Sequence, residues 1–138
     1  MEDLIIEASE YTPKVVLKPD KQIFCFFGNS FPVNPSDFYQ PILDWFSEFF
    51  KSANLTDELI VNFDFDYVNT SSSKQIAYLL MFFESLIEKD KILINWYYDP
   101  KENDMLETGE KYLGYANLRF KFTDKTIETP IQIALKLI

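Results

Sequence analysis

The stretch ELIVNFDFDYVNTSSSKQIAYLLMFF, residues 58–83, changes its hydrophobic period partway along. In its first half, positions 59, 61, 63, 65 and 67 alternate with their neighbours, which predicts a strand with one buried face that ends near Val68. In its second half, apolar residues recur every three or four positions. That spacing predicts a helix, followed by Lys89-Asp90-Lys91, with an apolar side made of Ile76, Leu79, Leu80, Phe83, Leu86 and Ile87. The polar residues 69–73 form the turn and the first helical positions of this strand–turn–helix unit.

Upstream of this unit, the sequence predicts a hairpin and a helix. Two β-rich runs, 14–18 and 22–27, are separated by Pro19-Asp20-Lys21 and closed by Gly28-Asn29, which is typical of paired antiparallel strands. Ser36 is a candidate N-cap of the helix, and Pro41 falls near its first turn. The apolar side of this helix is expected to carry Phe38, Ile42, Trp45, Phe46 and Phe49.

Downstream, the sequence predicts strands at 92–98 and 118–123, with a helix between them that has Pro100 at its start and Gly114 past its end. Alternating strands and helices imply parallel crossovers, to which the hairpin adds antiparallel strands. We therefore expect an α/β fold, a single domain over residues 1–138 with a mixed sheet and about three helices packed on it. The end of the chain, TIETPIQIALKLI, fits a strand or a helix.

The composition limits the classes of function. The chain has 138 residues and a formal charge of −9, which disfavours nucleic acid and anionic membrane surfaces as ligands and favours protein partners. The acidic N-terminus does not resemble a signal peptide and no apolar run is long enough to span a bilayer, so we expect a cytoplasmic protein without membrane insertion. The single cysteine, Cys25, is expected to be a buried thiol. The sequence contains no histidine, which removes Ser-His-Asp and Cys-His catalysis and His-containing zinc sites.

The turn is the strongest candidate site. Asn69 is followed by four hydroxyl residues, Thr70, Ser71, Ser72 and Ser73, and then by Lys74. Free N–H groups at a helix N-terminus favour an anion, so the turn is expected either to bind a phosphate on a ligand or to become phosphorylated itself. The structural alternative is that Asn, Thr and Ser are simply good N-caps.

Two other groups of residues are weaker candidates. Asp64 and Asp66 point to one face of their strand and could serve a cation or acid–base chemistry, but a solvated sheet face is the favoured interpretation and no metal is predicted. Trp96, Tyr97 and Tyr98 end a strand and are a candidate partner surface. Core packing of one or two of them is the alternative, with Ile94, Trp96 and Tyr98 on one face and Tyr97 on the other.

Five blocks of the chain resemble the SiaC-type family of bacterial regulatory phosphoproteins. They are YTPKV (11–15), GNSFPVN (28–34), FYQPILDW (38–45), FDYVNTSSSK (65–74) and NWYYDPKENDMLETGE (95–110). The resemblance covers about residues 1–123, while residues 124–138 form an unmatched tail. Val33 stands where many members have an acidic residue. The family is similar in fold to STAS domains, which implies a STAS-like domain here.

The resemblance implies a partner switch without catalytic activity or a cofactor of its own. A GHKL-type Ser/Thr kinase would phosphorylate the protein and a PP2C-like phosphatase would reverse the modification. The unphosphorylated form would bind and activate a diguanylate cyclase, which implies a role in c-di-GMP signalling, biofilm formation and aggregation. The phosphothreonine of the family falls on Thr70, and Ser71 is the second choice. Asn69, Ser71, Ser72, Ser73 and Lys74 would then contact the phosphate or the partner.

Two hypotheses from other classes stay open. A flavodoxin-like protein would bind a phosphate-bearing ligand, such as a flavin, through the same hydroxyl-rich loop. A small hydrolase using Asp64 and Asp66 is disfavoured by the absence of histidine and of a glycine-rich phosphate loop.

Overall fold

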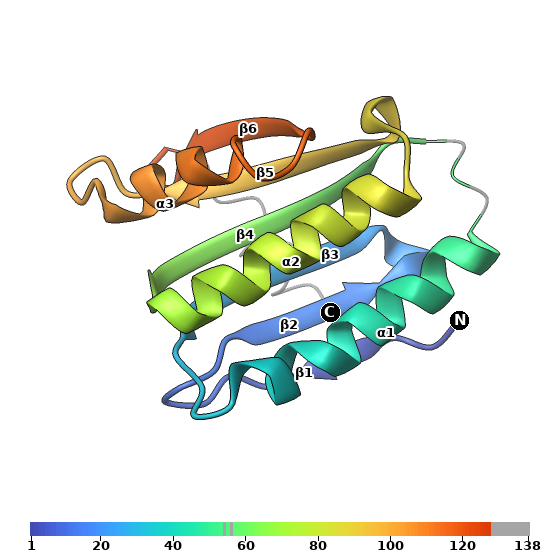
Figure 1. The fold of residues 1–138 in the computed structure, drawn as a ribbon, viewed down its shortest axis with the longest axis horizontal. Coiled ribbons are helices and arrows are strands. Elements are labelled where there is room, and N and C mark those ends of the chain that lie inside the picture. The colour runs from blue at the N-terminus through green and yellow to red at the C-terminus, as the bar shows by residue number, and fades with distance from the viewer. Residues whose placement is uncertain (54, 56, 128–138) are drawn as a thin grey trace.

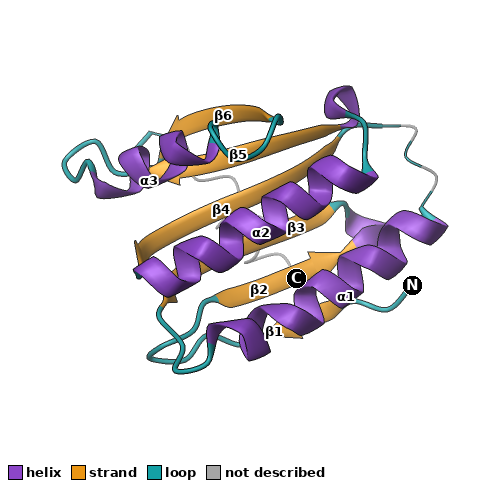
Figure 2. Cartoon of the chain, in the orientation of Figure 1, coloured by secondary structure: helices purple, strands orange, loops and turns teal. Residues whose placement is uncertain are grey.

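The computed structural model describes residues 1–53, 55 and 57–127, which form a six-stranded sheet with three α-helices (Figures 1 and 2). The strands, in spatial and chain order, are β1 (Leu4–Ile6), β2 (Lys14–Lys18), β3 (Ile23–Ser30), β4 (Leu59–Val68), β5 (Ile92–Tyr98) and β6 (Arg119–Asp124). The helices are α1 (Pro35–Ser52), α2 (Thr70–Leu86) and α3 (Asp104–Tyr112), with short 3-10 turns η1 (Pro19–Lys21) and η2 (Lys89–Lys91). The expected α/β class, mixed sheet and three helices are confirmed.

The topology places all three helices on one face of the sheet. β1, β2 and β3 pair antiparallel, whereas β3, β4, β5 and β6 pair parallel. Each parallel connection moves to the next strand in the same direction, and because such crossovers are right-handed, their helices fall on the same side. Figure 1 shows α1, α2 and α3 side by side over that face. The sheet therefore has one face that carries the three helices and an opposite face over which no described helix lies.

Phenylalanine forms much of the layer between helices and sheet. Phe26 on β3 stacks on Phe63 of β4 with centroids 4.8 Å apart, and Phe46 of α1 meets Phe83 of α2 at 4.7 Å. Each of these four side chains is fully buried. Large rings bury much apolar area per residue, which explains why a chain of this size uses fourteen phenylalanines.

The N-terminal half departs from the sequence-based expectation in three ways. Edge strand β1 was not expected, and β3 continues through Gly28-Asn29, where the expected turn is only a register shift with Gly28 at φ 108°. Helix α1 begins at Pro35, not after Ser36, because a proline at the first helical position needs no N–H partner. Pro41 lies inside the helix.

In the C-terminal half, the structure differs from the sequence-based prediction mainly at the ends of the helices. Leu86 is the last residue of α2 and is exposed, Ile87 lies beyond it, and residues 89–91 form the separate turn η2. Helix α3 starts at Asp104, later than Pro100 suggested. After β6 the described chain ends in a turn, residues 125–127, so the question of strand or helix in the tail lies outside the described residues.

Tyr67 was expected on the buried face of β4 but is 50% exposed. The pairing with β3 explains the difference, since Gly28 faces Phe65 and Asn29 faces Tyr67, so that Asp66 is skipped. An extra residue in one strand breaks the period of two. The side chain of Tyr67 is thereby freed from the core beside the turn.

Helix α3 is held to the sheet by a close approach at Gly109. Trp96 of β5 is buried, and its indole N–H donates to the Met105 carbonyl at 2.7 Å. A Cβ placed on Gly109 would lie 2.6 Å from the Trp96 ring and 2.9 Å from Phe122. The glycine is therefore required by the packing of the indole.

We expect Gly109→Ala to lower the free energy of unfolding by about 1–3 kcal/mol, because the added methyl group overpacks this contact. Gly114→Ala is the matched control, since its Cβ would meet nothing closer than the Lys111 carbonyl at 3.5 Å, and should change stability by less than about 0.5 kcal/mol. Urea denaturation of both variants measures this, and equal stability would contradict the packing role.

Candidate functional site

The turn between β4 and α2 is fixed first by its asparagine. The backbone N–H of Asn69 donates to the Ser30 carbonyl at 3.0 Å, which ties the turn to the end of β3. Its side-chain Oδ1 accepts from the Ser72 N–H at 2.9 Å, which caps α2. The capping role that the sequence allowed for this turn is thus filled by Asn69 alone.

Ser72 belongs to a buried cluster of three hydroxyls. Ser30 Oγ donates to Ser72 Oγ at 3.0 Å and lies 2.7 Å from the Tyr39 hydroxyl, and all three side chains are fully buried. Because the Ser30 proton points to Ser72, the Tyr39 hydroxyl donates to Ser30. Burial raises the pKa of Tyr39, so the phenol stays a neutral donor. This hydroxyl cluster, Ser30–Tyr39–Ser72, joins β3, α1 and α2.

Ser73 connects α2 to α3. Its Oγ lies 2.9 Å from the Tyr112 hydroxyl, which itself donates to the Ser73 carbonyl at 3.2 Å. Burial raises the pKa of Tyr112 to about 12, in spite of the hydrogen bond from Ser73. The ring of Tyr112 also meets Trp96 edge to face at 5.3 Å. The third helix is thereby positioned against the start of the second.

Thr70 and Ser71 are left at the surface. Both residues are exposed, and within the described part of the chain neither hydroxyl makes a hydrogen bond. The four hydroxyls of the turn therefore divide into two that hold the fold, Ser72 and Ser73, and two that are accessible. Lys74 is also exposed, and its ammonium lies 5.8 Å from the ring centre of Tyr78.

A groove of about 650 Å³ opens beside Thr70 between α2 and α3. Tyr78, Met81 and Tyr115 contribute large apolar side chains that are about half exposed, and Lys74 and Lys111 contribute positive charge. The other lining residues are Val68, Asn69, Thr70, Ser73, Ala77, Thr108 and Tyr112. A partly apolar groove with two cations, on a protein of charge −9, has the character of a protein-binding surface.

A second set of aromatic side chains lies on the strand side of the turn. Tyr67 meets Phe31 at 5.7 Å, and Phe31 meets Tyr11 at 5.3 Å, both edge to face. Val33 nearby in the chain is 97% exposed. Sequence reasoning missed this set, because the period of two assigned Tyr67 to the core. The signal that could have found it is the glycine at position 28, where a bulge was to be expected.

The predicted aromatic surface at 96–98 is mostly interior. Trp96 and Tyr97 are 1% and 0% exposed, on opposite faces of β5 as expected, and only Tyr98 keeps partial exposure. The burial of Trp96 and Tyr97 favours core packing over a partner surface, which is the alternative that the sequence left open.

Asp64 and Asp66 do share one side of β4, where Lys125 binds both at 3.3 and 3.0 Å. Asp64 is only 5% exposed, so a solvated face describes Asp66 but not Asp64. Burial alone would lower the pKa of Lys125, but the hydrogen bond and charge of Asp66 and the charge of Asp64 outweigh it and raise that pKa. Among the described residues, no group of three or more Cys, Asp or Glu side chains is arranged to hold a metal ion.

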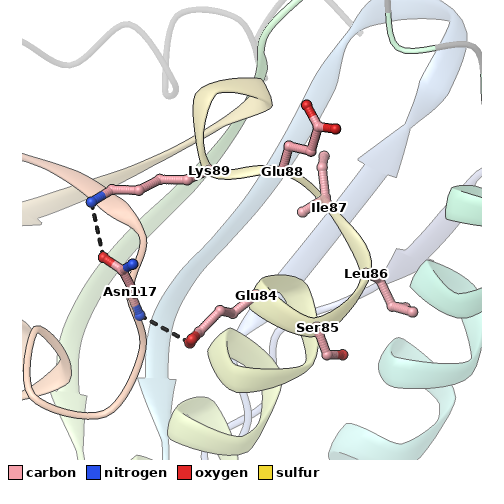
Figure 3. A pocket seen from close by; sticks show the side chains of 7 residues that line it. All are labelled: Glu84, Ser85, Leu86, Ile87, Glu88, Lys89 and Asn117. Carbon is pink, nitrogen blue, oxygen red and sulfur yellow. Dashed lines mark hydrogen bonds between the residues drawn. The ribbon is translucent and has the colours of Figure 1, made fainter.

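A shallow hollow at the far end of α2 contains none of the predicted site residues. Figure 3 shows Asn117 between its two partners: its N–H donates to Glu84 at 2.9 Å, and its side-chain oxygen accepts from Lys89 at 2.9 Å. A 17-residue helix is about 25 Å long, so this hollow is remote from Thr70. Asn117 thus links Glu84 to Lys89 across the hollow.

Comparison with known proteins gives consistent results. The SiaC family of regulatory phosphoproteins matches residues 6–125. An uncharacterized protein of Pseudomonas aeruginosa (strain UCBPP-PA14) is 25% identical over 113 residues, which cover 81% of this chain and 88% of the relative. No described helix is long and apolar enough to cross a membrane.

Two solved structures share the fold. Apo-SiaC from Pseudomonas aeruginosa superposes with a TM-score of 0.78 at 23% identity, over 89% of this chain and 99% of that one. The complex of the diguanylate cyclase SiaD with its activator SiaC, from the same organism, contains a chain with a TM-score of 0.77 at 22% identity, over 87% of this chain and 98% of that one. The fold inferred from the resemblance is confirmed, and so is the regulatory class.

We expect Ser72→Ala to lower the free energy of unfolding by about 1–3 kcal/mol, because it leaves the buried Ser30 hydroxyl without its acceptor. Ser71→Ala removes an exposed hydroxyl one position earlier on the same helix, and should cost less than about 0.5 kcal/mol. Urea denaturation of the two variants measures both free energies of unfolding. Equal losses of stability would contradict the division into buried and exposed hydroxyls.

Proposed function

The chain belongs to the SiaC family of regulatory phosphoproteins, and from this premise we propose that it is a partner-switching regulator controlled by phosphorylation of the turn at 69–73. In its unphosphorylated form it binds and activates a diguanylate cyclase. The observation that carries the proposal is the division of hydroxyls in the turn. Two are enclosed by the fold, and two stand exposed beside a groove that suits a protein partner.

Thr70 is the proposed phosphorylation site, with Ser71 as the second choice. Thr70 is the first residue of α2, so a phosphate there would lie near free backbone N–H groups and the positive end of the helix dipole. Lys74 follows one turn later on the same helix. Ser72 is unsuitable, since its modification would require breaking the buried hydroxyl cluster.

The choice of partner follows from the family and from one neighbour. SiaC of Pseudomonas aeruginosa is described as the activator of the diguanylate cyclase SiaD and forms a complex with it. Because this chain has the same fold over nearly its full described length, a diguanylate cyclase is the proposed partner here, with c-di-GMP signalling and biofilm formation as the outputs. A GHKL-type kinase and a PP2C-like phosphatase are the proposed modifying enzymes.

The groove beside Thr70 is the proposed docking surface. Tyr and Met side chains are enriched at protein interfaces, and Lys74 and Lys111 favour a partner segment that carries acidic residues. Thr70 lines the same groove, so any partner that fills it comes into contact with the turn.

Electrostatics then explains the switching. A phosphate on Thr70 adds about −1.5 to −2 charges at an exposed position that the fold tolerates. A partner covering the turn would enclose that charge, at a cost on the order of 2–5 kcal/mol, or roughly 30- to several-thousand-fold in affinity. Phosphorylation therefore releases the partner without unfolding the regulator.

The flavodoxin-like alternative receives no support from the turn. Such a loop directs its donors toward the ligand, whereas the Asn69 side chain is engaged as the cap of α2 and the Ser72 and Ser73 hydroxyls are engaged by Ser30 and Tyr112.

The first test is the modification itself. Treated with its kinase, the folded protein should carry phosphate on Thr70, and Thr70→Val should lose most of it, while Ser73→Ala, a change of a hydroxyl already engaged by Tyr112, should retain it. Fragment mass spectrometry locates the group. Calorimetric titration should then show cyclase affinity reduced by roughly 30-fold or more for the phosphorylated protein. Phosphate on Ser72 or Ser73, or equal affinity of both forms, would refute the switch.

A second test concerns the groove. Tyr78→Ala and Met81→Ala should each weaken binding of the unphosphorylated protein to the cyclase by about 1–2 kcal/mol, or roughly 5- to 30-fold. Leu86→Ala is the matched control, because Leu86 has similar exposure on the same helix but lies at the opposite end. If Leu86→Ala weakens binding as much as the groove variants do, the docking surface lies elsewhere on α2.

A further inference from the structure

Three aromatic side chains form a second surface at the turn, opposite the groove. Tyr67 of β4 meets Phe31 with ring centres 5.7 Å apart, and Phe31 meets Tyr11 at 5.3 Å. Tyr11 and Tyr67 are 47% and 50% exposed, and Phe31, which contacts both rings, is partly buried. These three residues are called the strand-side surface below.

The strand-side surface and the groove adjoin Thr70 from two sides. Tyr11 and Phe31 belong to the loops after β1 and β3, which Figure 1 shows on the side of α2 away from α3. The Phe31 N–H donates to the Tyr11 carbonyl at 2.8 Å, which joins the two loops. The Asn69 N–H donates to the Ser30 carbonyl at 3.0 Å, which joins the second loop to the turn. Asn69 and Thr70 also line the groove, so the two surfaces are continuous through the turn.

The groove alone is smaller than a stable protein interface. A standard interface buries roughly 800 Å² of each partner and takes roughly 20 to 30 residues from it. Twelve described residues line the groove. An interface of standard size that includes the groove must therefore extend onto neighbouring surface.

The position of Thr70 decides the direction in which the interface extends. Thr70 is exposed and stands at the N-terminal end of α2, where the groove meets the turn. A partner bound to the groove alone would leave Thr70 at the rim, where water and salt screen a phosphate and its cost is small. A partner that also contacts the strand-side surface covers Thr70 from both sides and encloses a phosphate there.

We propose that the strand-side surface is a second part of the site that binds the diguanylate cyclase, so that Thr70 lies at the centre of the interface. This inference rests on the proposed function and extends its docking surface. Tyrosine side chains supply much of the binding energy at the centres of interfaces.

The two surfaces differ in charge, which defines the chemistry of the cyclase surface that meets them. The strand-side surface consists of uncharged rings and takes apolar side chains of the partner. The groove contains Lys74 and Lys111 and no described Asp or Glu, so it takes acidic ones. The cyclase surface is therefore apolar on one side of the position that meets Thr70 and acidic on the other.

Calorimetric titration with a diguanylate cyclase that the unmodified protein binds tests this surface. Tyr11→Ala and Tyr67→Ala, in unphosphorylated full-length protein, should each weaken binding by roughly 5- to 30-fold, because each removes a ring from the interface. Tyr67→Phe keeps the ring and should bind within about threefold of the unmodified protein.

Ile60→Ala is the matched control, because Ile60 is 42% exposed at the opposite end of the same strand. It should change the affinity by less than about twofold. Thermal unfolding shows which variants are folded, and if Tyr67→Ala does not fold, Tyr11→Ala decides.

The groove variants separate failure of this inference from failure of the proposed function. If Tyr78→Ala and Met81→Ala weaken binding but Tyr11→Ala and Tyr67→Ala do not, the strand-side surface lies outside the interface and the proposed function stands. If no cyclase binds the unmodified protein, the proposed function fails, and this inference fails with it.

Two further results would assign the strand-side surface to another occupant and overturn the inference. The first is that Tyr11→Ala and Tyr67→Ala slow phosphate transfer from the kinase but keep full affinity for the cyclase, because the surface would then bind the kinase. The second is that light scattering shows a dimer of the unmodified protein alone, which these variants convert to a monomer without a change in cyclase affinity. A second copy of the chain would then be the occupant.

Discussion

The hydrogen bond from Ser30 to Ser72 joins two residues that are 42 positions apart and determines where helix α2 begins. It works together with the backbone bond from Asn69 to Ser30, so the end of β3 holds both the cap and the first turn of the helix. Tyr39 of α1 completes the cluster from the third side. Leaving a buried hydroxyl without a hydrogen bond costs free energy, so this arrangement holds the turn in one conformation. The positions of Thr70 and Ser71 follow from it.

Much of the fold could be predicted because hydrophobic period and turn residues are local signals. The strand at 92–98 was predicted with its observed ends, and α2 begins at Thr70, within the residues 69–73 assigned to the turn and the first helical positions. The predictions were wrong where a proline shifted the start of a helix or a bulge interrupted the alternation of side chains along a strand. Helix α1 begins at Pro35, whereas an N-cap at Ser36 would have placed its first residue at position 37. In β4, Asp66 has no pairing partner on β3, and the side chain of Tyr67 consequently points outward.

The sequence pointed to the turn as the candidate site, but it could not distinguish the roles of the individual hydroxyls there. Four consecutive hydroxyls look equivalent along the chain, and only contacts with distant residues distinguish them: Ser30 for Ser72, and Tyr112 for Ser73. The groove likewise depends on the placement of α3, which Trp96 and Gly109 fix by a packing fit that no periodic pattern encodes. Long-range side-chain pairing of this kind is the information that local patterns lack.

The division of the hydroxyls also bears on which of them a modifying enzyme could reach. In the unfolded chain, Thr70 to Ser73 are four neighbouring hydroxyls with similar access, and an enzyme reading only the local sequence has little basis for choosing among them. In the folded protein two of the four are already engaged by partners from β3 and α3. Tertiary structure thus limits which hydroxyls are accessible before any enzyme binds. To an enzyme that modifies one of these hydroxyls, a folded chain and a misfolded one would be different substrates, although their sequences are identical.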